Sequence, residues 1–225
     1  LAAHDWGGAV AWTFVYDHPE LLHKFVIMNL PHPSLFLKHF QRNEAQMKRS
    51  WYIFYFQIPF LAEYRLLEPG KGYVDQEDVD RSTKDDGKFV SISPPSSAAG
   101  AGIALERVLI GSMESPQNLS LKEARTITDG ARKPGSITAM VNYYRNIFSL
   151  DAVLEQGKNA KRPIIEIPTL LVWGEKDTAL GKELTVGTDQ FVRNLTTFYV
   201  PEASHWVQQD AHEAVNQKME EFLQD

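Results

Sequence analysis

Cysteine is absent from all 225 residues of the chain. Its absence excludes disulfide bonds and thiolate metal ligands, but it fits a reducing and an oxidising compartment equally well. The histidine and carboxylate residues do not fill this gap, because none of them cluster at the spacing of a metal-ligand set. We therefore expect neither a metal ion nor another cofactor.

The chain also lacks an excess of positive charge. Its formal net charge is −6 at pH 7, and its isoelectric point is about 5.7. Binding to a phosphate backbone needs clustered lysine and arginine side chains. The composition therefore argues against a nucleic-acid partner.

A third absence concerns long apolar segments. No run reaches the roughly 18 apolar residues of a spanning helix, and the longest apolar cluster, residues 51–61, is interrupted by Gln57 and Pro59. The chain does not open with a signal-peptide pattern. Its first residue is leucine rather than methionine, and residues 1–3 read as the end of a strand. This start predicts that the sequence begins within a domain, so any targeting or anchoring segment would lie upstream and the localisation stays unassigned.

The patterns that are present predict an α/β protein. Residues 1–33 read as a strand, a sharp turn, a helix and a second strand, which together form one βαβ crossover. In this segment, the apolar run at 25–30 is stopped by Pro31, as is typical of a buried parallel strand. The sheet pattern returns in residues 164–225, with strands expected at 169–174 and 198–200 and an amphipathic helix over 210–223.

Between these two core segments, residues 34–163 have a helical and aromatic pattern without further buried strands. We interpret them as a helical cap inserted into the sheet domain. Within the cap, about 68–102 is poor in large apolar residues and ends in a run of small ones. Such a stretch cannot bury enough surface to offset its ordering entropy, so we expect a flexible insert there.

The strongest chemical signal is residues 3–8, with the sequence Ala-His-Asp-Trp-Gly-Gly. A sharp turn from strand to helix forces strained dihedrals on its central residue, here Asp5, and requires small neighbours such as Ala3 and Gly7, with Gly8 adding room. A carboxylate at this position attacks an alkyl carbon that bears a leaving group and forms an ester with the protein. The alternative is that Asp5 only caps the following helix.

Hydrolysis of such an ester needs a general base and a group that orients it. Asp177 follows the strand expected at 169–174, and His205 follows the strand expected at 198–200. Both therefore lie at the carboxyl ends of parallel strands, where open α/β sheets place their sites. Three alternatives stay open: Asp177 is a solvated turn residue, Glu175 is the acid instead, or His205 is a satisfied loop histidine. The six other histidines lack this placement, and we interpret them as structural or exposed: His4, His18, His23, His32, His39 and His212.

Five motifs in this order resemble those of the α/β-hydrolase-fold epoxide hydrolases. They are the nucleophile motif at 4–8, two cap tyrosine motifs at 51–59 and 142–146, the acid motif at 171–177 and the base motif at 203–206. The overall sequence pattern is most similar to that of the animal subgroup whose members carry an N-terminal membrane anchor. The resemblance covers nearly the whole chain except about 68–102, and it implies an α/β-hydrolase fold with an inserted helical cap.

The resemblance also implies a role for each motif. Asp5 would open the epoxide by forming a covalent ester, and His205, oriented by Asp177, would activate the water that hydrolyses it. Tyr52 and Tyr144 would donate hydrogen bonds to the epoxide oxygen.

Each of the two cap motifs contains two tyrosines, and two tryptophans follow the predicted nucleophile and base. Tyr52 is chosen over Tyr55 because it precedes Phe56 and Gln57 at the family's spacing, and Tyr144 is chosen over Tyr143 because it directly precedes Arg145. The alternative for all four tyrosines is packing in an aromatic core. Trp6 would supply an oxyanion donor through its backbone N–H, and Trp206 would line the substrate pocket.

The chain departs from the pattern of this family in two respects. The loop that carries the fold's second oxyanion donor, usually within His-Gly-x-Pro, does not occur, and about four N-terminal strands with their helices are missing from the family's layout. We expect this chain to fold poorly and to be inactive by itself, and its full-length parent to be active. Association with a membrane, at the endoplasmic reticulum in this subgroup, would depend on the missing anchor.

The predicted activity is hydrolysis of an apolar epoxide, lipid-derived by family analogy, to a vicinal diol. Two other functions stay open. A haloalkane dehalogenase uses the same aspartate nucleophile but needs halide-binding N–H donors rather than paired hydroxyls, so Tyr52 and Tyr144 favour epoxides. A non-catalytic, truncated hydrolase-like protein is the other possibility, against which the intact Asp5, Asp177 and His205 weigh.

Overall fold

The structure is a computed structural model that describes residues 1–67, 104–146 and 162–224. These residues form two compact units. The first contains residues 1–52 and the described residues from 162 onward, and the second contains the described residues between 53 and 146. The expected flexible insert at about 68–102 lies outside the described residues. None of the helices in the described ranges is long and apolar enough to cross a membrane.

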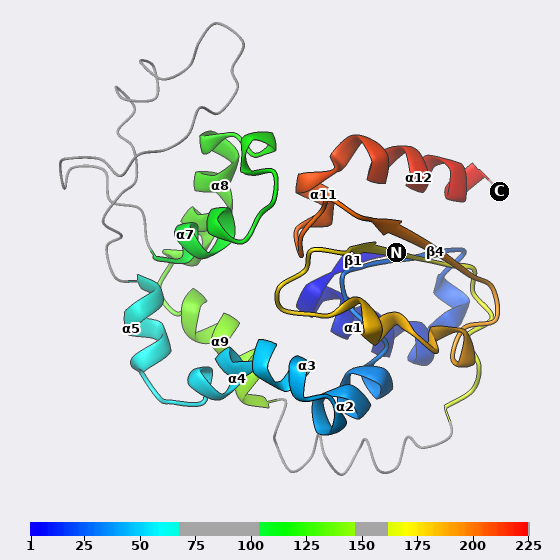
Figure 1. The fold of residues 1–225 in the computed structure, drawn as a ribbon, viewed down its shortest axis with the longest axis horizontal. Coiled ribbons are helices and arrows are strands. Elements are labelled where there is room, and N and C mark those ends of the chain that lie inside the picture. Colours follow the sequence, from blue (N-terminus) through cyan, green and yellow to red (C-terminus); the bar gives the residue numbers. More distant parts are fainter. Residues whose placement is uncertain (68–103, 147–161, 225) are drawn as a thin grey trace, which may run out of the picture. The chain divides into compact units, whose positions relative to one another are not determined.

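The first unit is built on a parallel sheet (Figure 1). Its strands are β1 (Ala2–His4), β2 (Phe25–Met28), β3 (Thr169–Gly174) and β4 (Leu195–Val200), and they lie side by side in the order in which they follow along the chain. The register pairs Ala2 with Val26, Val26 with Leu170 and Leu170 with Thr196. The sheet therefore places the carboxyl ends of all four strands at one edge, as the sequence pattern predicts.

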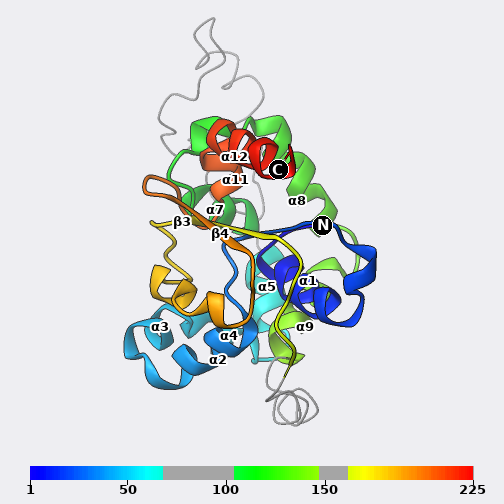
Figure 2. The same cartoon turned by 90° about the vertical axis from the view of Figure 1, so that its right-hand side faces the viewer.

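Alternating side chains of the strands face two different apolar layers. One layer packs the sheet against α1 (Asp5–Asp17) and includes Trp12, Phe25, Ile27, Leu171 and Trp173. The other packs it against α11 (Val207–Asp210) and α12 (His212–Gln224) and includes Val26, Leu170, Val172, Val207 and Phe222. Figure 2 shows α11 and α12 on one side of the sheet and α1 on the other. Helices on both faces explain why β2 and β3 are apolar without alternation.

Two helices that follow β2 also belong to the first unit: α2 (Pro33–Arg42) and α3 (Glu44–Arg49). The side chain of Asn43 caps α3 by accepting hydrogen bonds from the backbone N–H groups of Ala45 and Gln46. The side chain of Gln46 is buried and bonds to the carbonyl of Ala179 and the N–H of Gly181. The cap predicted from residue 34 onward therefore differs from the observed helical unit, because residues 34–52 group with the sheet.

Short 3₁₀ turns complete the connections of this unit. They are η1 (Pro19–Leu21), η3 (Lys182–Thr185) and η4 (Thr188–Gln190).

The second unit is helical. Its elements are α5 (Leu61–Leu67), α7 (Ala104–Gly111), the 3₁₀ turn η2 (Pro116–Asn118), α8 (Leu121–Ala131) and α9 (Ser136–Asn146), together with the last four residues of α4 (Trp51–Phe56). A capping box between Ser120 and Glu123 begins α8. The core of the second unit includes Ala62, Ala131, Ile137 and Val141.

Arg145 joins α9 to the segment between α4 and α5. Its guanidinium group forms a two-pronged ion pair with Glu63, with nitrogen–oxygen distances of 2.6 and 3.0 Å. The same side chain donates hydrogen bonds to the carbonyls of Phe56 and Ile58. Such bidentate pairing fixes the geometry more strictly than a single contact does.

The packing of α1 against the sheet depends on Gly8 rather than on Gly7. A Cβ atom at Gly8 would lie 2.5 Å from Ile27 Cδ1 and 3.1 Å from Leu30 Cβ, whereas a Cβ atom at Gly7 would meet nothing within 4 Å. The expectation that Gly7 must be small is therefore not supported by its surroundings in this structure. The close approach of helix and strand occurs one residue later.

These two neighbouring glycines form a matched pair for a stability measurement. We predict that Gly8→Ala lowers the free energy of unfolding by about 1–3 kcal/mol, because the added methyl group overpacks a buried contact. Gly7→Ala should change it little. Urea or thermal unfolding of both variants measures the difference, and equal effects of the two substitutions would contradict the assignment.

Candidate active site

Asp5 occupies the junction between β1 and α1. His4 ends the strand in an extended conformation, with φ −136° and ψ 148°, and Asp5 begins the helix with a φ of +47°. A positive φ is uncommon for a residue with a side chain, although aspartate tolerates it better than most. The sharp, strained turn predicted from residues 3–8 is therefore present.

His205 lies between two carboxylates. Its Nδ1 is 2.7 Å from Asp177 Oδ2, and its Nε2 is 3.3 Å from Asp5 Oδ1. A carboxylate at Nδ1 fixes the tautomer that carries a proton on this nitrogen, so Nε2 is the atom that faces Asp5. The structure thus brings together the predicted nucleophile, base and acid from the ends of three different strands.

The carboxylate of Asp177 accepts four hydrogen bonds. Oδ1 accepts from the backbone N–H groups of Ala179 and Leu180, both at 2.8 Å, and Oδ2 accepts from His205 and from the side-chain amide of Asn29. Glu175, the alternative acid, instead pairs with Lys182 at 2.8 Å. Of these two carboxylates, it is therefore Asp177 that orients the imidazole.

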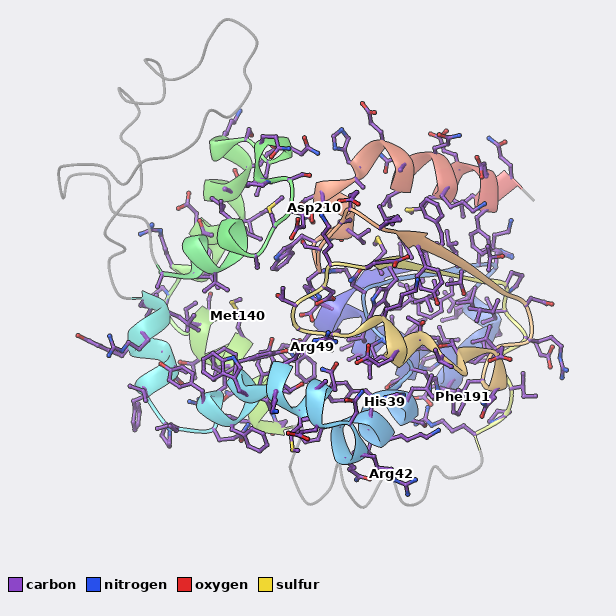
Figure 3. The ribbon with its side chains drawn as sticks, viewed as in Figure 1. His39, Arg42, Arg49, Met140, Phe191 and Asp210 are labelled. Atoms are coloured by element: carbon purple, nitrogen blue, oxygen red, sulfur yellow. The ribbon has the colours of Figure 1, made fainter. Side chains whose placement is uncertain are left out.

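The loop that carries His205 is held from both sides. Ser204 donates two hydrogen bonds to Asp210 Oδ2, from its N–H at 2.8 Å and from its hydroxyl at 2.5 Å. Asp210 lies at the end of α11 (Figure 3). On the other side, the carbonyl of His205 accepts a hydrogen bond from Nε2 of His4 at 2.8 Å.

Gly174 allows this loop to approach the end of β3. A Cβ atom at Gly174 would lie 2.0 Å from the carbonyl oxygen of Ser204 and 2.6 Å from that of Ala203. No side chain fits at such distances, because both neighbours are backbone atoms that cannot turn aside. The absence of a side chain at Gly174 is thus a condition for the position of His205.

The two carboxylates control the charge of His205. Burial alone favours the neutral imidazole, but hydrogen bonds to and the negative charges of Asp177 and Asp5 outweigh it and raise the pKa of His205 to about 10. In return, the hydrogen bond and positive charge of His205 hold the pKa of Asp5 below its ordinary value, although burial acts in the opposite direction. At neutral pH the resting site therefore contains an imidazolium between two anions.

His4 is a contact of the site that the sequence pattern did not single out. Burial and the nearby charge of His205 lower the pKa of His4 to about 4, so its ring is neutral at physiological pH. Its ring centre lies 4.7 Å from that of His205 and 5.5 Å from that of Trp206. A neutral His4 can donate from Nε2 to the His205 carbonyl without adding a positive charge beside the base.

The remaining histidines lie away from this arrangement. His18, His23 and His212 are exposed, and His39 is partly exposed on α2. His32 is buried, stacks on Phe191 and bonds to the hydroxyl of Tyr16. Within the described ranges, no group of three or more histidine and acidic residues could hold a metal ion.

The two predicted tryptophan positions flank the triad. The backbone N–H of Trp6 donates a hydrogen bond to the carboxylate of Asp5. The ring of Trp206 lies edge-on to His205, with a centre-to-centre distance of 5.3 Å. Both residues are therefore next to the atoms that would react, and their roles stay predictions.

The two predicted cap tyrosines fall in different units. Tyr52 lies in α4 and groups with the sheet, whereas Tyr144 lies in α9 of the helical unit. Tyr144 packs against Phe56 at a ring distance of 4.7 Å, and its carbonyl accepts a hydrogen bond from Gln57 at 2.9 Å. Both tyrosines are partly buried. Their action on a substrate oxygen remains a prediction.

Several known proteins are similar to this chain. Epoxide hydrolase 3 of Xenopus tropicalis is 32% identical over 226 residues, a match that covers all of this chain and 52% of that protein. Human epoxide hydrolase 4 is 29% identical, with 100% of this chain and 53% of that protein covered. The chain thus spans about half the length of the curated relatives it matches. No protein-family model matches it.

Solved structures point the same way. A Bacillus megaterium epoxide hydrolase in complex with an inhibitor has a TM-score of 0.66 and 26% identity, with 100% of this chain and 69% of that one covered. A variant of that enzyme, complexed with its naphthyloxy-propanediol product, has a TM-score of 0.68 at 25% identity. The chain has the α/β-hydrolase fold. Several of its relatives in sequence and several of its neighbours among solved structures are named epoxide hydrolases.

The pKa of His205 gives a direct test of the charge arrangement. We predict that Asp5→Asn lowers the pKa of His205 from its value of about 10, because the anion 3.3 Å from Nε2 is removed. Nitrogen-15 NMR of labelled histidine, followed as a function of pH, measures this change. Glu175→Gln is the control, since Glu175 pairs with Lys182, and it should leave His205 unchanged. An unchanged His205 titration in Asp5→Asn would contradict the proposed charge coupling.

Proposed function

We propose that the protein hydrolyses an apolar epoxide to a vicinal diol through a covalent ester on Asp5. The observation that carries the proposal is the carboxylate at a strained turn, 3.3 Å from an imidazole that a second carboxylate orients. A serine in place of Asp5 would favour acyl substrates, whereas a carboxylate attacks alkyl carbon. The similarity to epoxide hydrolases supports the choice of an epoxide over another alkylating substrate.

The first step is opening of the ring. A carboxylate oxygen of Asp5 forms a bond to the less hindered epoxide carbon, and the electron pair of the breaking carbon–oxygen bond moves to the epoxide oxygen. Tyr52 and Tyr144 donate hydrogen bonds to that oxygen, and one of them transfers its proton to the developing alkoxide. The product of this step is a hydroxyalkyl ester of Asp5.

Formation of the ester lowers the pKa of His205. The ester carries no charge, so His205 loses one of the two anions that hold its pKa at about 10. Burial and the remaining carboxylate of Asp177 then set the pKa at a lower value. The imidazolium gives up its proton, which returns through solvent to the tyrosinate left by ring opening and restores the phenol. The neutral Nε2 becomes available to take a proton from water.

The second step is hydrolysis of the ester. Water loses a proton to His205 and attacks the carbonyl carbon of Asp5. The backbone N–H of Trp6, which already bonds to this carboxylate, donates to the oxyanion that forms. Collapse of the intermediate releases the diol and restores the carboxylate, which then contains one oxygen atom from water.

The substrate we propose is apolar and includes lipid-derived epoxides. The segment around Tyr52 is rich in aromatic residues, among them Trp51, Phe54 and Phe56. Apolar and aromatic walls with few polar groups are typical of sites for apolar ligands. The product bound by the Bacillus megaterium enzyme is likewise a largely aromatic diol.

Removing the base should trap the ester. We predict that His205→Gln still becomes alkylated by styrene oxide, but hydrolyses the ester about 10²–10⁴-fold more slowly, because the general base is lost. The intact mass of the protein should rise by the mass of the epoxide and stay raised. Asp5→Asn is the matched control and should gain no mass.

Isotope labelling gives an independent test of the same route. In a single turnover in ¹⁸O water, the first diol formed should contain an unlabelled oxygen from Asp5. Labelled diol in the first turnover, without a mass adduct in His205→Gln, would mean that water attacks the epoxide directly. A chlorinated alkane, supplied in parallel, distinguishes an epoxide hydrolase from a dehalogenase.

The tyrosines are tested through ring opening. We predict that Tyr52→Phe and Tyr144→Phe each slow ester formation by about 10-fold or more, because one donor to the leaving oxygen is lost. Tyr55→Phe and Tyr143→Phe remove the neighbouring hydroxyl groups and serve as controls. Stopped-flow measurement of the alkylation step compares all four. A larger effect from either control would transfer the role to that residue.

A further inference from the structure

Asn29 is a buried polar residue at the carboxyl edge of the sheet. It directly follows β2, the strand between the one that carries the nucleophile and the one that precedes the acid. Its side chain is fully buried, and its backbone has a φ of +39°. The backbone N–H of Asn29 still pairs with the carbonyl of Val172 at 3.0 Å. A left-handed residue without exposure is sustained only where its surroundings fix it.

Both ends of the Asn29 amide are engaged. The oxygen accepts a hydrogen bond from the N–H of Gly174 at 2.9 Å. The nitrogen donates to Asp177 Oδ2 at 2.8 Å and more weakly to the carbonyl of Gly174 at 3.4 Å. The opposite orientation of the amide would face its oxygen toward two acceptors, so only one orientation fits.

One of these hydrogen bonds reaches Oδ2 of Asp177, the atom that also accepts the hydrogen bond from His205. Oδ2 of Asp177 receives both the Asn29 amide and Nδ1 of His205. Oδ1 is fixed separately by the N–H groups of Ala179 and Leu180. Asn29 therefore defines the plane in which Oδ2 meets the imidazole, and it ties that plane to the end of β3 through Gly174.

We propose that Asn29 is a positioning residue that holds the Asp177 carboxylate in the orientation that aligns His205 for hydrolysis of the ester. This inference rests on the proposed function, since it assigns the residue to the second step of that reaction. Asn29 touches neither substrate nor the reacting atoms and acts through Asp177. Ring opening by Asp5 uses His205 only as a counter-ion and not as a base, so the main effect of Asn29 falls on the step that follows.

The amide suits this position because it donates without charge. The titratable groups that face this part of the site are Asp177, His205, Asp5 and His4. An ionised carboxyl group in place of the amide would set a second anion beside Asp177 and remove the donor. A protonated carboxyl group would restore a donor to Oδ2.

The variant Asn29→Asp keeps the size of the side chain and replaces the uncharged amide donor with a carboxyl group that can ionise. We expect its rate of ester hydrolysis, relative to the parent, to fall by about 10-fold or more as the pH rises and the new carboxyl group ionises. Ester formation should change much less. Asn29→Ala should slow hydrolysis by a ratio that does not depend on pH.

Asn216→Asp is the matched control, because it adds the same charge at an exposed position of α12. The variants are compared in the longest form of the protein that its gene encodes, by single-turnover kinetics with styrene oxide from mildly acidic to mildly basic pH. Thermal unfolding of each variant shows whether it is folded. Equal hydrolysis rates in the parent and in both Asn29 variants would overturn the proposal, and so would a deficit in Asn29→Asp that does not vary with pH.

A second readout needs no substrate. The proton on Nδ1 of His205, bonded to Asp177, should give a low-field proton NMR signal in the parent. We expect Asn29→Ala to shift or broaden this signal and Asn216→Asp to leave it unchanged. An unchanged signal in Asn29→Ala would overturn the positioning role. If the parent opens no epoxide, the proposed function is wrong, and this signal alone then decides whether Asn29 orients Asp177.

Discussion

The hydrogen bond between His205 Nδ1 and Asp177 Oδ2 is the interaction on which the geometry of the site depends. It joins two loops that follow different strands, and each loop is fixed by contacts of its own. Asp210 and His4 hold the loop of His205, while Gln46 and backbone N–H groups hold the loop of Asp177. The parallel sheet makes the meeting possible, because it delivers the carboxyl ends of all its strands to one edge.

The charges of the site follow from the same geometry. One imidazole lies between two carboxylates, which raise its pKa. In the proposed mechanism, its positive charge balances the negative charge with which Asp5 attacks. In that mechanism, the covalent bond proposed at Asp5 removes this negative charge and with it the reason for the extra proton. A single residue can thus serve first as a counter-ion and then as a base, with the chemical step itself causing the change.

Much of this arrangement could be predicted from the sequence. The strand at 169–174 has the predicted bounds, since its six residues are all buried and apolar character marks it clearly. The strand predicted at 198–200 begins earlier, at Leu195, because it ends the order of described strands and exposes Thr196 and Thr197. Two consecutive exposed threonines leave too weak an apolar signal to reveal the start of the strand.

Contacts between distant parts of the chain could not be predicted in the same way. Gln46 reads as an ordinary polar helix residue, and only the fold brings it to Ala179, 133 residues away. Asn29 was hidden inside an apolar run that reads as a strand, although a polar residue at the end of a buried strand is a usable signal. His4 was interpreted as structural or exposed, because its contact with the carbonyl of His205, 201 residues away, comes from the fold.

The close contact at Gly174 couples the conformations of two loops. Gly174 has only a hydrogen atom between the end of β3 and the backbone at residues 203–204. The segments that follow β3 and β4 are therefore in close backbone contact there. Neither could be lengthened, or exchanged for the corresponding segment of a relative, without refitting the other. Engineering of this scaffold by loop grafting would have to transplant the two segments as one piece.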